Sequence, residues 1–212
     1  MITISAFEWV PDFARGQVRD LRPRWALEEA GIPYRTRLLA QGEQDKPEYR
    51  ALQPFGQVPI FEENGFVLFE TGAIVLHIAE CSEALLPKEP QARSRATQWV
   101  VAALNSIEPF LMQVALIDLF YKDEEWAKLR RPGAVEFAQR RLKGLAGALG
   151  DKPYLDGDHF TVGDLMMSSV LRILPDLARE HANLAAYVER CTARPAFQRA
   201  LTAQLDDFKQ AA

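Results

Sequence analysis

Cysteine and histidine are scarce in this chain, whose 212 residues include two cysteines and three histidines. Cys81 and Cys191 lie far apart, and the histidines show none of the short spacings that bind zinc or iron. The sequence therefore predicts no metal site and no disulfide framework. So few cysteines are also typical of a reducing cytoplasm, which is the location we expect.

Long apolar runs and an excess of basic residues are missing as well. No apolar run reaches the roughly 18 residues that a membrane span needs, and the first residues lack the pattern of a signal peptide. A net charge of −4 disfavours nucleic acid as the main partner, because phosphate-binding surfaces are usually basic. The glycine-rich nucleotide motifs and the G-x-S-x-G hydrolase motif are also absent. We expect neither a membrane nor a nucleic acid as partner.

What the chain does have is an ordinary globular composition, with 48% hydrophobic and 25% charged residues. This balance excludes disordered and repetitive classes of protein. The first region alternates strand and helix patterns: a strand over 2–7, a helix over 18–30 and a strand over 34–39. Gly31 stands where a helix C-cap glycine belongs. A helical connection of this length predicts that the two strands are parallel.

A hairpin and a further helix complete this region. Asn64-Gly65 separates two runs rich in β-forming residues, which is the strongest short-range signal for a β-hairpin. Residues 71–80 then show helical spacing. The order up to residue 81 is therefore strand, helix, strand, a connection, a hairpin and a helix.

A proline-containing linker over 82–91 separates this region from the rest of the chain. Residues 92–212 show helical periodicity almost throughout. Apolar residues recur every three or four positions from Trp99 to Tyr121, which predicts a long helix that faces a core. Pro109 is expected to kink this helix one turn earlier.

Thr161 and Asp164 form the clearest local motif of the second region. Thr161 is predicted to cap a helix, and Asp164 to reach back to the N–H of Thr161. The helix that follows is nearly uncharged, so we expect it at the centre of the second region. Further helices are predicted over 133–149 and, in two pieces that break near Pro195, over 182–208.

This succession of elements resembles the cytosolic glutathione transferases. Residues 53–80, QPFGQVPIFEENGFVLFETGAIVLHIAE, are similar to that family's Asn-Pro-x-Gly-x-Val-Pro run, its hairpin and its Glu-Ser-x-Ala-Ile helix start. Gln53 replaces the family's Asn and Thr71 its Ser. TVGD at 161–164 is similar to the family's Ser/Thr-x-Ala-Asp helix cap.

The resemblance implies an α/β plus all-α fold. A thioredoxin-like β-α-β-β-β-α domain over 1–81 would bind glutathione, and 82–91 would be the linker. An all-helical domain over 92–212 would form the pocket for an electrophile. A homodimer is implied by resemblance alone.

The resemblance also implies how glutathione, the co-substrate, would be held. Glu70 would bind its α-amino group, and Thr71 would offer its hydroxyl and N–H to the neighbouring carboxylate, at the start of a helix that favours anions. Val58, before a cis Pro59, would pair its main chain with the cysteinyl unit. Two glutamine side chains would also contact the peptide, Gln57 and Gln44. The alternative for Glu70-Thr71 alone is an ordinary helix start, and for the FGQVP run an ordinary turn, but their joint occurrence at this spacing favours the glutathione site.

The family's sulfur-activating residue has no counterpart in this chain. The family uses a Tyr, Ser or Cys after the first strand or at the start of the first helix, and none stands between Phe7 and Leu27. Lowering the thiol pKa by two units takes about 2.7 kcal/mol. The candidate donors are main-chain N–H groups over 16–19 and the side chains of Arg15, Gln17 and Arg19. Both arginines can equally be exposed, or paired with Asp12 or Asp20.

Aromatic and aliphatic residues are candidates for the wall of an electrophile pocket, although simple core packing explains them equally well. These residues are Trp9, Phe13, Phe110, Val114, Ile117 and Tyr121.

Three functions stay open at this point. The favoured one is a detoxifying transferase that adds the glutathione thiolate to small apolar electrophiles. A protein that binds glutathione without catalysis is the second. Glutathione-dependent disulfide reduction is the third, because the leaving thiolate then carries much of the charge.

Overall fold

The computed structural model describes residues 1–210, which form two compact units. The first comprises Met1–Leu86 and the chain from Ala193 onward, and the second is Pro87–Thr192. The C-terminal helix thus joins the first unit, because it packs against α1 (Leu21–Ala30). The predicted domain boundaries at 81 and 92 differ from this division and stay a prediction.

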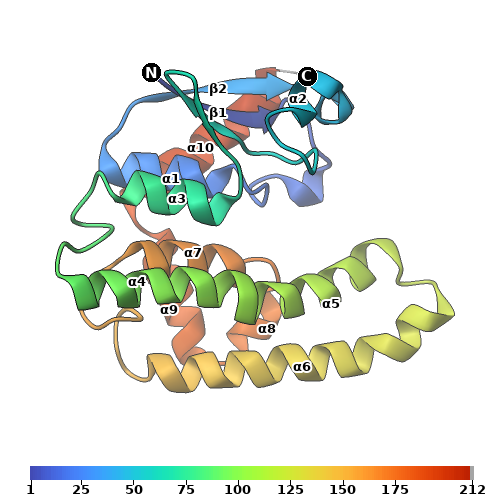
Figure 1. The fold of residues 1–212 in the computed structure, drawn as a ribbon. Helices are drawn as coiled ribbons and strands as arrows, with labels where there is room; N and C mark the ends of the chain where they lie inside the picture. Colours follow the sequence, from blue (N-terminus) through green and yellow to red (C-terminus); the bar gives the residue numbers. More distant parts are fainter. Residues whose placement is uncertain (211–212) are drawn as a thin grey trace. The chain divides into compact units, whose positions relative to one another are not determined.

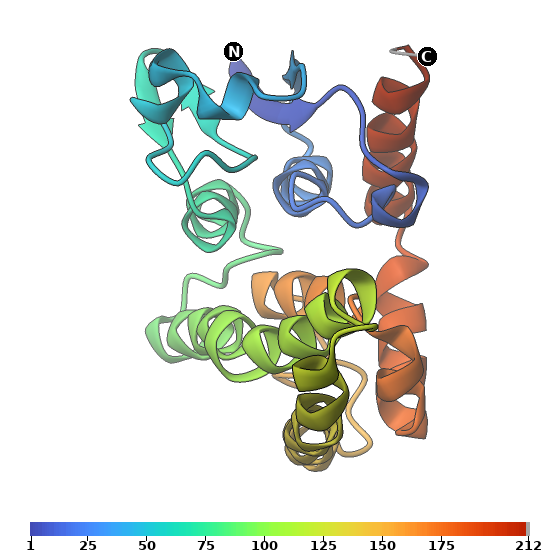
Figure 2. The same ribbon diagram turned by 90° about the vertical axis from the view of Figure 1, so that its right-hand side faces the viewer.

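A four-stranded mixed sheet organises the first unit, in the order β2-β1-β3-β4. β1 is parallel to β2 and antiparallel to β3, and β3 and β4 form an antiparallel hairpin. Figure 1 shows α1 and α3 side by side on one face of this sheet, and Figure 2 shows α10 alongside α1. The elements are β1 (Ile2–Phe7), η1 (Asp12–Ala14), α1 (Leu21–Ala30), β2 (Tyr34–Leu39), η2 (Glu43–Asp45), α2 (Pro47–Arg50), β3 (Phe61–Glu63), β4 (Phe66–Leu68), α3 (Thr71–Ala79) and α10 (Pro195–Gln210).

The turn signals of the first unit are confirmed. Asn64 and Gly65 both have positive φ, at 50° and 83°, as a two-residue hairpin turn requires. Gly31 ends α1 in the left-handed conformation. These details, with the helical region that follows, confirm the predicted thioredoxin-like plus all-helical fold.

Helix α1 begins three residues later than its apolar spacing predicts. A helix from Val18 would place Pro23 in its interior, where the missing N–H and the ring are costly. In the structure Pro23 is the third residue of the helix, in the first turn, where an N–H has no intrahelical acceptor. Residues 16–19 form turns before the helix.

The second unit is helical. All ten residues of α7 are buried, which confirms its predicted central place. Figure 1 shows α5 and α6 running alongside each other in this unit. The elements are α4 (Pro90–Ala102), the π-helical turn η3 (Ala103–Ile107), α5 (Glu108–Phe120), α6 (Glu125–Leu149), α7 (Val162–Leu171), α8 (Pro175–Arg179) and α9 (Ala182–Thr192).

Two prolines act differently in these helices. Pro109 follows the π-helical turn, so the predicted irregularity lies one turn before it. Pro132 stands inside α6, which begins eight residues earlier than predicted. Three fully buried alanines lie before and after Pro132 in the sequence, Ala127, Ala134 and Ala138. Their tertiary packing offsets the roughly 3 kcal/mol cost of an interior proline.

The stretch Pro90–Phe120 is long and apolar enough to cross a membrane, by length and composition. Its most apolar window is 44% buried inside the structure, and the core helix of a soluble protein meets the same test. In this fold α4 and η3 pack against α7, and α5 packs against α6. This packing accounts for the apolar residues of the stretch. A single helix of this kind is only weak evidence for a membrane span.

Candidate functional site

The main chain around Val58 forms the first part of the candidate site. The Val58–Pro59 bond is cis, as the resemblance implies. The next residue, Ile60, is tied to β1, because the Ser5 N–H donates to the Ile60 carbonyl at 3.0 Å. Within residues 1–210 the N–H and C=O of Val58 itself make no hydrogen bond. These two groups can therefore pair with an extended peptide.

The start of α3 forms the second part. Glu70 precedes this helix with φ 69° and ψ 117°, and its side chain does not cap the helix. The first helical hydrogen bond runs from the Ile74 N–H to the Glu70 carbonyl at 2.9 Å. In the described chain the N–H groups of Thr71, Gly72 and Ala73 therefore have no acceptor, as expected for an uncapped first turn. Such a turn attracts an anion.

A buried arginine lies behind this helix start, and sequence reasoning did not predict it. Arg22, which is 5% exposed, donates from Nη1 to the Thr71 Oγ1 at 3.3 Å. The Thr71 hydroxyl accepts this bond and can still donate its own proton. Two effects, positive charge and an oriented hydroxyl, thus favour an anion at the start of α3.

The two glutamines of the candidate site differ in the structure. Gln57 has an exposed side chain, and its carbonyl accepts a hydrogen bond from the Tyr49 hydroxyl at 2.8 Å. The Gln44 amide is engaged locally: its oxygen accepts from the Gly42 N–H, and its nitrogen donates to Asp45. Gln44 would have to exchange these bonds in order to contact a peptide.

The candidate sulfur-activating groups lie on the segment before α1. Arg15 is exposed and pairs with Asp12 at 3.3 Å, one of the two pairings considered for it. Gln17 is exposed, and Arg19 is half-buried. Since α1 begins at Leu21, the N–H groups over 16–19 precede the helix. Any effect of the helix dipole on them is weaker than the sequence predicts.

Asp20, the other acidic residue considered as a partner for the arginines, is buried and hydrogen-bonded within the first unit. Its carboxylate accepts from the Arg24 Nε at 2.8 Å and from the Gln204 Nε2 at 2.7 Å. Arg24 also pairs with Asp207 of α10 at 2.6 Å. Burial raises the pKa of Asp20, and Arg24 and Gln204 only partly oppose it. This network joins α1 to α10 and serves the packing of the first unit.

The six predicted pocket residues divide between the two units. Trp9 and Phe13 belong to the first unit and are 46% and 56% exposed. In the second unit Val114 and Ile117 are buried, whereas Tyr121 is 46% exposed and its ring lies 5.2 Å from that of Trp126.

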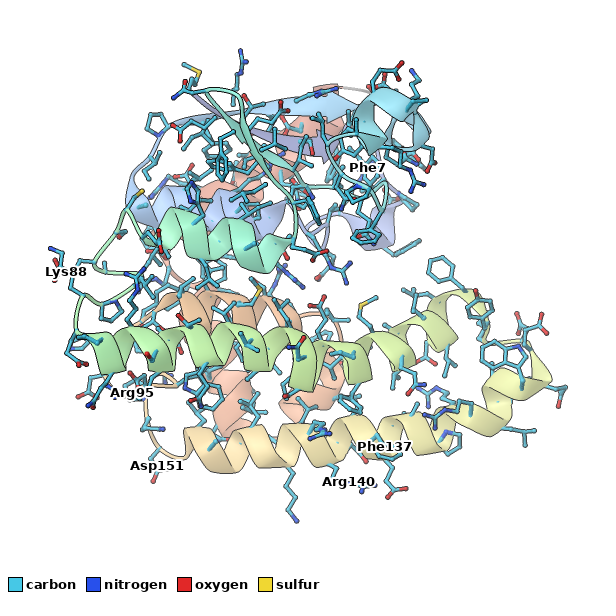
Figure 3. All side chains as sticks on the ribbon, in the orientation of Figure 1. Phe7, Lys88, Arg95, Phe137, Arg140 and Asp151 are labelled. Atoms are coloured by element: carbon cyan, nitrogen blue, oxygen red, sulfur yellow. The ribbon has the colours of Figure 1, made fainter. Side chains whose placement is uncertain are left out.

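Phe110 packs within the second unit. Its ring stacks on Phe137 of α6 at 6.3 Å, and the Arg141 guanidinium lies 4.6 Å from its centroid. Figure 3 marks Phe137 on α6 with Arg140, whose guanidinium covers the Phe137 ring. An electrophile pocket built from the six predicted residues stays a prediction.

Metal ligands do not gather in the described part of the chain. No group of three or more His, Cys, Asp or Glu side chains there could hold a metal ion.

A model of the glutathione S-transferase N-terminal domain matches residues 13–80. Glutathione S-transferase F11 of Arabidopsis thaliana is 30% identical over 171 residues, which cover 74% of this chain and 79% of that protein. The disulfide-bond oxidoreductase YfcG of Escherichia coli is 29% identical over 199 residues, 85% of this chain and 89% of that protein.

A solved structure agrees with these sequence matches. The theta class glutathione S-transferase of the citrus canker pathogen Xanthomonas axonopodis pv. citri was determined with glutathione bound. It has a TM-score of 0.77 and 27% sequence identity, and the match covers 96% of this chain and 98% of that one.

Proposed function

Because this chain belongs to the cytosolic glutathione transferase superfamily, we propose that it binds glutathione in its first unit and adds the glutathione thiolate to small apolar electrophiles. The observation that carries the proposal is the uncapped start of α3. This helix start brings together N–H groups without an acceptor in the described chain, the hydroxyl of Thr71, buried Arg22 and the carboxylate of Glu70. This set suits a ligand that carries an ammonium and a carboxylate on neighbouring atoms.

Each group has a separate task in this proposal. Glu70 binds the α-amino group of the γ-glutamyl unit. Thr71 donates its hydroxyl and N–H to the adjacent carboxylate, while Arg22 adds positive charge behind it. Val58 pairs its N–H and C=O with the cysteinyl main chain, and Gln57 and Gln44 are further candidates for peptide contact.

The transfer step joins the glutathione sulfur to an electrophilic carbon. The thiol first loses its proton to solvent or a base. A carbon–sulfur bond then forms, and the electrophile releases its leaving group with the bonding electron pair. Arg15, Gln17 and Arg19 are the candidates that stabilise the thiolate. Half-buried Arg19 suits this task better than exposed Arg15, because a charge shielded from water acts more strongly on a nearby thiolate.

Calorimetric titration with glutathione tests the binding step. We expect saturable binding to the wild-type chain, much weaker binding in Glu70→Ala, and turnover of a chlorodinitrobenzene-type electrophile. Glu48→Ala removes the same charge from an exposed position on α2 and is the matched control. Absence of binding to the wild type would refute the proposal.

Disulfide reduction is the second candidate, favoured by the similarity to the oxidoreductase YfcG and by the missing activating hydroxyl or thiol. A glutathione thiolate would attack one sulfur of a disulfide, break the S–S bond and release the other sulfur as thiolate. A second glutathione would then release the remaining thiol and form glutathione disulfide. A reductase assay with a small model disulfide separates the two activities.

A binding protein without catalysis is distinguished by the pKa of the bound thiol. The transferase proposal predicts a pKa well below the ordinary value near 8.5, which ultraviolet titration of the bound thiolate measures. A cytoplasmic homodimer acting in detoxification is part of the same proposal and rests on the family alone.

A further inference from the structure

Three hydroxyl-mediated hydrogen bonds hold the main chain on either side of the cis bond. The Ile60 N–H donates to the Ser5 Oγ at 2.8 Å. The Ser5 and Tyr49 hydroxyls lie 2.9 Å apart, and the Tyr49 hydroxyl lies 2.8 Å from the Gln57 carbonyl. One chain of hydrogen bonds thus spans Val58 and Pro59 and is anchored in β1.

Donor and acceptor roles in this chain of hydrogen bonds follow from its two end groups, the Ile60 N–H and the Gln57 carbonyl. The Gln57 carbonyl can only accept, so Tyr49 donates to it. The Ser5 oxygen accepts from Ile60, and its own proton is then available to the Tyr49 oxygen. Burial raises the pKa of the Tyr49 phenol, while the bond to Ser5 and the charge of Arg37 oppose the shift. Tyr49 therefore keeps its proton near neutral pH.

This chain of hydrogen bonds fixes the plane of the Gln57–Val58 peptide. In a trans peptide the C=O and the following N–H point in opposite directions. A bond that holds the Gln57 carbonyl toward Tyr49 therefore holds the Val58 N–H on the other side. That N–H makes no hydrogen bond within the described residues.

Packing holds the tyrosine itself. Tyr49 is 2% exposed and lies in a cluster with Leu39, Val58 and Ile60. Phe7, marked in Figure 3, packs against this cluster. This packing restricts rotation of the Tyr49 ring and therefore holds its hydroxyl in one position.

We propose that Tyr49, supported by Ser5, is a positioning residue that orients the Gln57–Val58 peptide for pairing with the cysteinyl unit of glutathione. Neither side chain contacts the ligand in this proposal. The inference rests on the proposed function, since it explains how the Val58 main chain is kept ready for the peptide.

Tyr49→Phe tests the inference, because it removes the hydroxyl and keeps the ring. Tyr187→Phe is the matched control: Tyr187 is also buried, and its hydroxyl donates to Asp164 of the second unit at 3.0 Å. Both variants should unfold at lower temperature. We expect the glutathione dissociation constant to rise about three- to tenfold in Tyr49→Phe and less than about twofold in Tyr187→Phe.

Ser5→Ala and the double variant show whether the two hydroxyls act as one chain. Ser5→Ala should also weaken glutathione binding. The double variant should bind about as weakly as the weaker single variant, because either change breaks the same chain. Two independent effects that multiply would contradict this coupling.

The possible failures are distinguishable. Wild-type affinity in Tyr49→Phe, with a loss of stability like that of Tyr187→Phe, would overturn the inference and leave glutathione binding intact. No binding to the wild-type chain would overturn the proposed function and this inference with it.

Discussion

Two helix starts in this protein differ in how their first N–H groups are satisfied. At α7 the Thr161 side chain accepts from the Gly163 N–H, and the Asp164 carboxylate accepts from the Thr161 N–H. At α3 no side chain caps the helix, and Glu70 has a positive φ of 69°. A completed cap stabilises the fold, whereas an open one leaves donors for a ligand.

Burial separates the two starts as well. Asp164 is fully buried and also accepts from the Leu155 N–H and the Tyr187 hydroxyl. Glu70 is exposed, although it precedes a buried threonine. Two similar signals, a hydroxyl residue near an acid, therefore have different roles, and burial and hydrogen bonds distinguish them.

Asp164→Ala should give the largest change, and it should affect stability alone. It leaves the N–H groups of Leu155 and Thr161 without their carboxylate acceptor and removes the shorter of the two bonds that the Tyr187 hydroxyl makes to Asp164. We expect a loss of about 3 kcal/mol or more in the free energy of unfolding, measured in urea. Glutathione affinity of the folded protein should stay within about twofold, and a larger change would contradict the division of roles.

Glu70→Ala should give the opposite profile. Losing a charge-assisted bond to the ligand ammonium should weaken glutathione binding about tenfold to a hundredfold. Stability should change little, because the Glu70 side chain does not cap α3. Calorimetry and thermal melts of Glu70→Ala and Glu48→Ala, run together, check both statements.

A matched pair of substitutions compares the two threonines directly. Thr161→Val should cost about 1 kcal/mol of stability without changing glutathione affinity. Thr71→Val should weaken glutathione binding about five- to tenfold, and Thr71→Ser should restore it. Equal effects of the two valine substitutions on affinity would erase the distinction between the helix starts.

The start of α4 extends the comparison with the smallest expected effect. Exposed Glu89 accepts from the N–H groups of Gln91 and Ala92, and these bonds lower the pKa of its carboxyl. A lowered folded-state pKa means that this contribution to stability is present above the ordinary pKa and lost as the pH falls through the lowered value. Glu89→Ala should therefore lower the melting temperature slightly near pH 7, and by less as the pH falls. A melting-temperature shift that does not depend on pH in acid would contradict a role for the charge.

Local signals predicted much of the fold. The Asn64-Gly65 turn, the Gly31 helix end and the Thr161–Asp164 cap depend on residues close in sequence, and each is present as predicted. Family resemblance added the cis bond before Pro59, which local pattern cannot show.

Interactions between distant residues could not be predicted in the same way. The bond from Arg22 to Thr71 and that from Ser5 to Tyr49 each join residues more than forty positions apart. A helix is predicted only over 133–149, but α6 begins at Glu125 and continues through Pro132 and Gly133. Tertiary contacts decided each of these cases.

The most direct test of the central claim is amide hydrogen exchange, measured by NMR with and without saturating glutathione. We predict slower exchange at Val58, Thr71 and Gly72 when glutathione is bound, and unchanged exchange at Gly163 and Asp164. Binding of glutathione without protection at Val58 and Thr71 would contradict the claim that the open start of α3 and the main chain at Val58 form the binding site.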